Sequence, residues 1–149
     1  MKFERVTDIF PEDIKRLGAK TVFLDLDNTC VCYGSNYVDP DIREWVSRLK
    51  ESGLKVAVLS NTIPVRGHIV ASKLGSLPCF CLACKPLPFM ALLAAKILRT
   101  SPEEIVMIGD KLTADILCAN IIGAYSIKVD KLAGVILRQQ EERLRVAAQ

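Results

Sequence analysis

The sequence predicts an α/β fold: a central, mainly parallel sheet with helices on both faces, as in a Rossmann-like three-layer sandwich. Short runs rich in Val, Ile, Leu and Phe alternate along the chain with longer segments whose apolar residues recur at helical spacing. Parallel strands are buried on both faces and have such continuous apolar runs, and right-handed crossover helices join them.

Apolar runs predict the strands. The first, "KTVFLDL", is rich in apolar residues and comes shortly after Gly18. The predicted strands cover residues 20–26, 54–60, 103–110 and 124–129, and the segment 77–83 is expected to add a short one.

Helices are predicted between these strands. In "DPDIREWVSRLKESG", Asp39 is the expected N-cap, Pro40 takes the first helical position and Gly53 ends the helix. Its apolar stripe includes Trp45, which is therefore expected in the core. The other predicted helices cover 64–74, 87–99, 113–123 and 131–147, the last with "RQQEERLR" facing solvent.

The composition favours a single domain over residues 1–149. Of these residues, 50% are apolar and 25% charged, as is typical of a globular protein. The net charge of +3 is small and the basic residues are scattered, so no nucleic-acid binding is predicted. Neither a signal peptide nor a membrane span is apparent, so we expect a cytoplasmic protein whose six cysteines are reduced.

Polar residues gather at the carboxyl ends of the predicted strands, where parallel α/β sheets bind ligands. Taken singly, each could be a turn residue, a helix cap or a solvated charge. Their common position at one edge of the sheet predicts a functional site. These residues are Asp25, Asp27, Ser60, Asn61, Lys85, Asp110 and Asp115.

The residue types point to phosphoryl transfer. Clustered carboxylates repel one another unless a cation joins them, and Mg²⁺ prefers such oxygen ligands. One carboxylate can attack phosphorus, while a second protonates the leaving alcohol and then deprotonates a water molecule. Ser60 and Lys85 can hold and neutralise the phosphoryl oxygens.

Four segments, "DLDNT", "SNT", "KP" and "GDKLTAD", resemble in order the signature motifs of the haloacid dehalogenase superfamily of phosphatases. The resemblance implies that Asp25 is the nucleophile and Asp27 the general acid/base. With this second acid present, rapid hydrolysis of the aspartyl-phosphate is expected rather than its storage. The implied phosphate-binding residues are Ser60, Asn61 and Lys85, and the implied Mg²⁺ ligands are Asp25, the backbone carbonyl of Asp27, Asp110 and Asp115.

A narrower resemblance covers nearly the whole chain. "SNTIPVR", "ACKP", "GDKLTADILCANIIGA", the opening "IFPEDIKRLGAKTVFLDLDNT" and the tail "RQQEERLR" are similar to the YqeG-type branch, which includes mitochondrial phosphatidylglycerophosphate phosphatases. Cys30, Lys111 and residues 118–119 depart from that pattern without removing a catalytic group.

The gaps 29–60 and 61–85 are too short for the cap domain that many relatives insert, so an open site is expected. Such a site suits a large substrate such as a lipid headgroup, a protein or a nucleic acid end. Alternatively, a neighbouring subunit could cover the site as a lid. A small-molecule substrate is also possible. Peripheral membrane contact and homo-oligomer formation are further possibilities.

Two other functions would also suit a small α/β domain with clustered acids. A signalling receiver carries its phospho-accepting aspartate at the end of the middle strand, where this chain has Ser60 and Asn61. An idle scaffold typically loses the nucleophile or the second acid, and this chain keeps both. The cysteines at 79, 81 and 84 are read as thiols, because a structural zinc site usually needs four ligands and His68 is distant in sequence.

Overall fold

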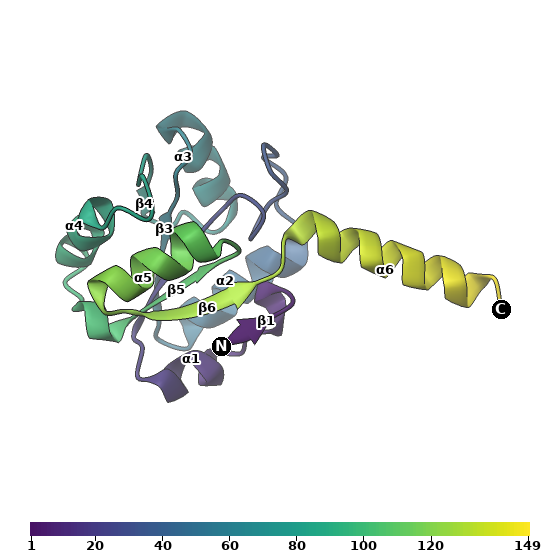
Figure 1. Cartoon of the computed structure of the whole chain (residues 1–149), viewed down its shortest axis with the longest axis horizontal. Helices are drawn as coiled ribbons and strands as arrows, with labels where there is room; N and C mark the ends of the chain where they lie inside the picture. Colours follow the sequence, from purple (N-terminus) through teal and green to yellow (C-terminus); the bar gives the residue numbers. More distant parts are fainter.

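Six parallel strands form one sheet with helices on both faces, which confirms the predicted α/β class (Figure 1). The computed structural model describes all residues from 1 to 149. The strands lie in the order β1-β6-β5-β2-β3-β4. Their bounds are β1 Lys2–Phe3, β2 Thr21–Leu24, β3 Lys55–Leu59, β4 Cys79–Phe80, β5 Ile105–Gly109 and β6 Tyr125–Val129.

Apart from α1, the helices follow the predicted segments, with ends displaced by one to a few residues. They are α1 Pro11–Leu17, α2 Pro40–Glu51, α3 Pro64–Lys73, α4 Phe89–Ile97, α5 Leu117–Ile122 and α6 Leu132–Ala147. A π-helical turn, Leu112–Ile116, precedes α5, and short 3-10 turns span Val6–Asp8 and Pro102–Glu104. The sequence analysis did not predict β1 or α1, which are too short to show a clear hydrophobic period.

The strand order reverses between β2 and β5. From β2 the chain proceeds outward to β3 and β4, whereas from β5 it proceeds in the opposite direction to β6. β2 pairs with β5 in parallel, with Leu24 beside Ile108. The residues that follow these two neighbouring strands are therefore adjacent, at the position where open α/β sheets bind ligands.

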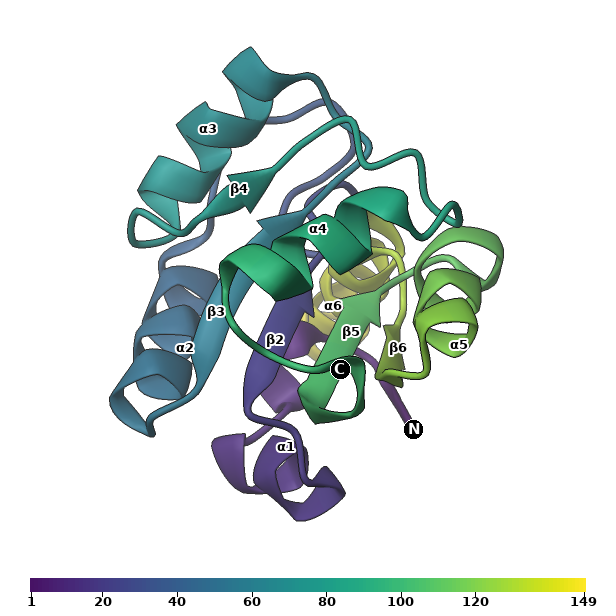
Figure 2. The same cartoon turned by 90° about the vertical axis from the view of Figure 1, so that its left-hand side faces the viewer.

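Each face of the sheet has its own core. One cluster of 25 buried residues includes side chains of α1, α2, α3 and α6, and another of 11 lies under α4 and α5. Figure 2 shows α4 and α5 side by side on that second face. There α4 packs Ala91, Ala94 and Ala95 against the sheet, while Phe89, Leu92, Leu93 and Ile97 are exposed.

Trp45 joins α2 to the segment before α1, as a core residue. Its side chain is 1% exposed, and its Nε1–H donates a hydrogen bond of 2.7 Å to the carbonyl oxygen of Ile9. Asp39 occupies the predicted N-cap position of α2, but its side chain makes no capping hydrogen bond. The indole, rather than the cap, therefore anchors this helix.

Helix α6 projects away from the rest of the molecule (Figure 1). Leu132 and Val135 are buried in its first turns, and every residue from 140 to 149 is exposed. The segment predicted to face solvent, 138–145, is exposed except for the half-buried Gln139. None of the helices combines the length and apolar character needed to cross a lipid bilayer.

Replacing the indole should weaken the fold measurably. Trp45→Phe removes the hydrogen bond to Ile9 and leaves a gap in the core, so we expect a loss of about 1–3 kcal/mol in unfolding free energy. Urea denaturation followed by circular dichroism measures this loss. Tyr37→Phe, at an exposed position, is the control and should change stability by less than about 0.5 kcal/mol. Equal stability of both variants would contradict the anchoring role.

Candidate active site

All seven side chains singled out in the sequence line one cavity of about 430 Å³ beyond the carboxyl ends of the strands. They come from the ends of β2, β3 and β5, from the connection between β4 and α4, and from the π-turn before α5. The full set is Asp25, Asp27, Ser60, Asn61, Lys85, Asp110 and Asp115.

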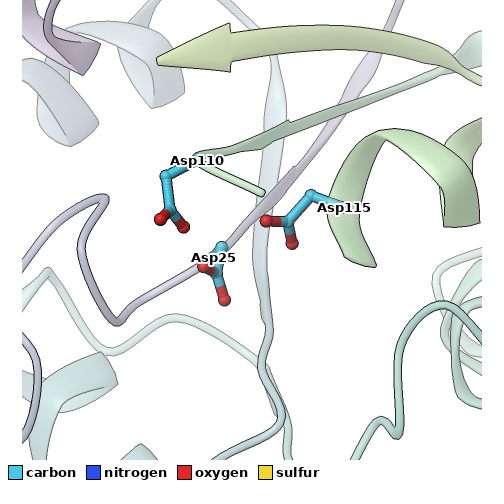
Figure 3. A group of neighbouring side chains, drawn as sticks. All are labelled: Asp25, Asp110 and Asp115. Atoms are coloured by element: carbon cyan, nitrogen blue, oxygen red, sulfur yellow. The ribbon is translucent and has the colours of Figure 1, made fainter. Parts of the chain in front are cut away.

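Three of the carboxylates form a tight group. Asp25, Asp110 and Asp115 each have a carboxylate oxygen within 4.8 Å of the others, and Figure 3 shows the three side chains facing a common space. The backbone N–H of Asp25 donates to the carbonyl of Ile108 at 3.0 Å, which continues the β2–β5 pairing into the site. Sheet pairing thus fixes where the group forms.

Asp110 has no partner of its own. Its side chain is buried, and neither carboxylate oxygen accepts a hydrogen bond. Burial raises the pKa of Asp110, and the nearby Asp115 raises it further. An unpartnered buried carboxylate is costly, and oxygen atoms from three carboxylates are the ligands that hard divalent cations prefer. The residues present therefore fit a divalent metal ion.

Lys85 supplies the positive charge next to this group. Its ammonium donates to Asp25 Oδ1 at 3.0 Å, to the carbonyl of Leu59 at 2.8 Å and to Asp115 Oδ1, so all three N–H groups are used. Burial lowers the pKa of Lys85, but the attraction of Asp25 and Asp115 outweighs it and the net shift is upward. Lys85 is therefore held as a cation.

Asp25 bears the largest electrostatic cost. Burial raises its pKa to about 7; Lys85 opposes the rise, whereas Asp115 and Asp110 add to it. One ammonium group therefore does not fully compensate the carboxylates around it. A bound cation would shift Asp25 back toward the ionised form.

Asn61 is exposed at the cavity, and its side-chain amide contacts the backbone of Lys85. Its side-chain oxygen accepts the backbone N–H of Lys85 at 2.8 Å, and its Nδ2 donates to the Lys85 carbonyl at 3.3 Å. The neighbouring Ser60 is buried at the end of β3, and its Oγ accepts the N–H of Thr62 at 3.2 Å. The sequence predicts Asn61 as a phosphate ligand; in the structure its amide holds the segment that carries Lys85.

The side chain of Asp27 stands apart from the three clustered carboxylates. Arg66 of α3 holds it with a two-pronged contact, from NH1 to Oδ2 at 2.8 Å and from NH2 to Oδ1 at 2.7 Å. Arg66 belongs to the segment "SNTIPVR" but was not predicted as a site residue, because it lies 39 positions from Asp27 in the sequence. No local pattern indicates such a pair.

Gly109 is a second residue that the sequence analysis missed. A Cβ atom at this position would overlap the carboxylate of Asp115. Only a glycine allows Asp115 to lie against the end of β5, where it contacts Lys85. The "GD" pair at a strand end was the available signal, but it is common in ordinary loops.

Gly109→Ala should displace Asp115. We expect a loss of about 1–3 kcal/mol in stability from the overlap, together with a smaller stabilisation by added Mg²⁺. Thermal unfolding with and without MgCl₂ measures both effects. Gly134→Ala is the matched control, because its Cβ would lie 3.7 Å from the nearest atom, on Arg138. Equal gains from Mg²⁺ in both variants and the wild type would contradict this account.

The raised pKa of Asp25 predicts a pH dependence of stability in the metal-free protein. The folded state binds this proton more tightly than the unfolded chain, so the contribution of Asp25 to stability is largest at low pH. It is lost as the pH rises from the ordinary pKa of 3.8 to about 7.

Asp25→Asn does not titrate and isolates this effect. The unfolding free energy of the wild type relative to Asp25→Asn should fall by roughly 2 kcal/mol in total between pH 5 and 7, with the slope flattening as the pH approaches 7. Urea denaturation in the presence of EDTA measures the difference. A difference that stays constant over this range would show that the Asp25 carboxyl has an ordinary pKa.

Comparison with known proteins places the chain in a family. The haloacid dehalogenase-like hydrolase family matches residues 8–123. The "probable phosphatase YqeG" of Bacillus subtilis is 33% identical over 150 residues, which cover 97% of this chain and 87% of that protein.

Two solved structures share the fold. A protein of Listeria monocytogenes serotype 4b superposes with a TM-score of 0.63 at 20% identity, over 73% of this chain and 77% of its own. The haloacid dehalogenase-type hydrolase YfnB of Bacillus subtilis, crystallised with magnesium bound, gives 0.55 at 17% identity, over 68% and 54%. Because the family match extends over most of its length, this chain belongs to the haloacid dehalogenase-like hydrolases.

Proposed function

We propose that the chain is a Mg²⁺-dependent phosphomonoester hydrolase that works through an aspartyl-phosphate on Asp25. The observation that carries the proposal is the Asp25 carboxylate, only 12% exposed, which is bonded to Lys85 and grouped with the unpartnered Asp110 at the cavity. Family membership and the relative described as a phosphatase support it. The magnesium bound to a hydrolase of the same fold supports the choice of metal.

The carboxylates of Asp25, Asp110 and Asp115, with the backbone carbonyl of Asp27, would hold Mg²⁺. When bound, the ion would neutralise negative charge and polarise the phosphoryl group. Lys85 contributes a fixed positive charge beside the attacking carboxylate, where the phosphoryl oxygens would arrive. Ser60 would bind a phosphoryl oxygen through its hydroxyl group. Asn61 would bind phosphate through its own backbone N–H, and its side chain would hold Lys85 in place.

In the first half of the reaction, a carboxylate oxygen of Asp25 attacks phosphorus. A bond forms between that oxygen and phosphorus, and the bond from phosphorus to the ester oxygen breaks. The leaving oxygen takes a proton from Asp27 and departs as an alcohol. The phosphoryl group is then attached to Asp25.

In the second half, water replaces the alcohol. Asp27, now a carboxylate, accepts a proton from the water molecule as its oxygen attacks phosphorus. The bond between Asp25 and phosphorus breaks, which releases inorganic phosphate and restores the Asp25 carboxylate. Asp27 ends the cycle with the proton that the next substrate needs.

The proposed substrate is a large phosphate ester with an accessible phosphate, for which phosphatidylglycerophosphate is one candidate and protein or small-molecule phosphates are others. Residues 1–149 would form one domain without a cap. Between β2 and α2 the chain makes only turns and an isolated bridge, and between β3 and α4 it forms α3 and β4 alone. Tyr33, 79% exposed, stands at the cavity where a large substrate would enter.

Phosphate release from a panel of esters tests this function. The panel contains p-nitrophenyl phosphate, phosphatidylglycerophosphate in micelles, a phosphopeptide, nucleotides and sugar phosphates. We expect activity with Mg²⁺ that EDTA abolishes and that Asp25→Asn lowers on the order of 10³-fold or more, since the nucleophile is lost.

Asp41→Asn is the matched control, because Asp41 is exposed and pairs with Arg5 away from the cavity. It should retain wild-type activity. If the folded, metal-loaded wild type releases phosphate from no member of the panel, the enzyme proposal is overturned and a binding scaffold takes its place.

A further inference from the structure

Arg66 connects three segments around Asp27. Besides its two contacts with the Asp27 carboxylate, NH1 donates to Thr62 Oγ1 at 3.1 Å and NH2 donates to the carbonyl of Ser35 at 2.7 Å. Its side chain is only 16% exposed. The guanidinium thus joins the start of α3 to the two loops that border the cavity.

These contacts leave Arg66 no free group for a substrate. Each terminal nitrogen of a guanidinium carries two hydrogens, and here each donates to two acceptors. The remaining N–H, at Nε, is buried without a partner. An arginine that binds phosphate needs its terminal nitrogens for the anion, so the geometry assigns Arg66 a different task.

The two oxygens of Asp27 are used unequally. Oδ1 accepts from Arg66 NH2 and also from the backbone N–H of Gly34 at 3.1 Å, whereas Oδ2 accepts only from Arg66 NH1. A carboxylate oxygen can accept about two hydrogen bonds. Oδ1 is therefore saturated, and Oδ2 keeps one acceptor position.

We infer that Arg66 is a positioning residue for Asp27, which it orients so that Oδ2 is the oxygen that handles the proton. The inference rests on the proposed function, in which Asp27 is the acid in the first half-reaction and the base in the second. Both steps require one oxygen to lie in the same place, first beside the leaving group and then beside water. A rigid fork that engages both oxygens supplies that constraint, and a lysine cannot form it.

The chain offers a matched control on the same helix. Lys73 of α3 donates to the carbonyl of Asn36 at 2.8 Å, so it ties α3 to the same loop that Arg66 reaches through Ser35. It makes no contact with Asp27 and does not line the cavity. Loop anchoring and carboxylate positioning can therefore be separated by comparing the two positions.

A double-mutant cycle tests the inference on the best substrate of the panel. The variants are Arg66→Ala, Arg66→Lys, Asp27→Asn, the double variant Arg66→Ala/Asp27→Asn, and Lys73→Ala. We expect Arg66→Ala to lower kcat about 100-fold with little change in KM, as for a misplaced catalytic group. In the Asp27→Asn background, Arg66→Ala should cause no further loss, because its effect passes through Asp27.

Arg66→Lys keeps the charge and guards against an unfolded alanine variant; it should still lose at least about 10-fold in kcat, because one ammonium cannot grip both oxygens. Lys73→Ala should stay near wild type. A raised KM with unchanged kcat in the Arg66 variants, multiplicative losses in the cycle, or wild-type kcat in Arg66→Lys would each overturn the inference alone. An inactive wild type would instead overturn the proposed function, and the inference with it.

Discussion

Three carboxylates and one ammonium group share a buried edge of the sheet, and the rest of the site is arranged around that charge imbalance. Lys85 contacts Asp25 and Asp115, while Asp110 is left without a partner. Burial is the main cause of the raised pKa values of Asp25 and Asp110, and repulsion between the neighbouring carboxylates adds to it. The carboxylates of this group could hold a divalent metal ion, which would offset their repulsion.

The sheet itself makes this concentration of charge possible. Asp25 and Asp110 follow adjacent strands at the point where the strand order reverses, so backbone pairing, and not side-chain attraction, brings them together. Large apolar cores on both faces hold the strands in place. Lys85 is fixed separately, by the Asn61 amide on its backbone and by the Leu59 carbonyl on its ammonium group. The sheet and its two cores therefore hold these carboxylates close together despite their mutual repulsion.

The sequence predicted those parts of the molecule that depend on local pattern. Apolar runs marked β2, β3, β5 and β6, and polar residues at the strand ends marked the cavity, because both signals lie within a few residues. The strands are shorter than their apolar runs at one or both ends, and at β2, β3 and β5 the residue that follows the strand lines the cavity. The two-residue strand β1 gave no usable periodicity.

What the sequence could not supply are the contacts between distant segments. Asn61 contacts Lys85 across 24 positions of the sequence, and Arg66 contacts Asp27 across 39. The spacing of these residues in the sequence does not distinguish such contacts from side chains that face solvent. The space that Gly109 leaves for Asp115 likewise depends on how the π-turn folds back on β5. These are properties of packing in three dimensions, which a linear pattern does not encode.

Helix α6 is built differently from the other elements. From residue 140 onward every residue is exposed, and none makes a side-chain hydrogen bond or an ion pair with the rest of the molecule. This outer part is therefore held mainly by helical hydrogen bonds, and short helices of this kind are marginal in water. Its outer backbone amides would therefore exchange with solvent through local fraying, on a different time scale from the amides of β2 and β5, which open only with the core. The chain consequently has two levels of cooperativity: one unit that carries the site, and a terminal helix that can melt and reform while the site stays intact.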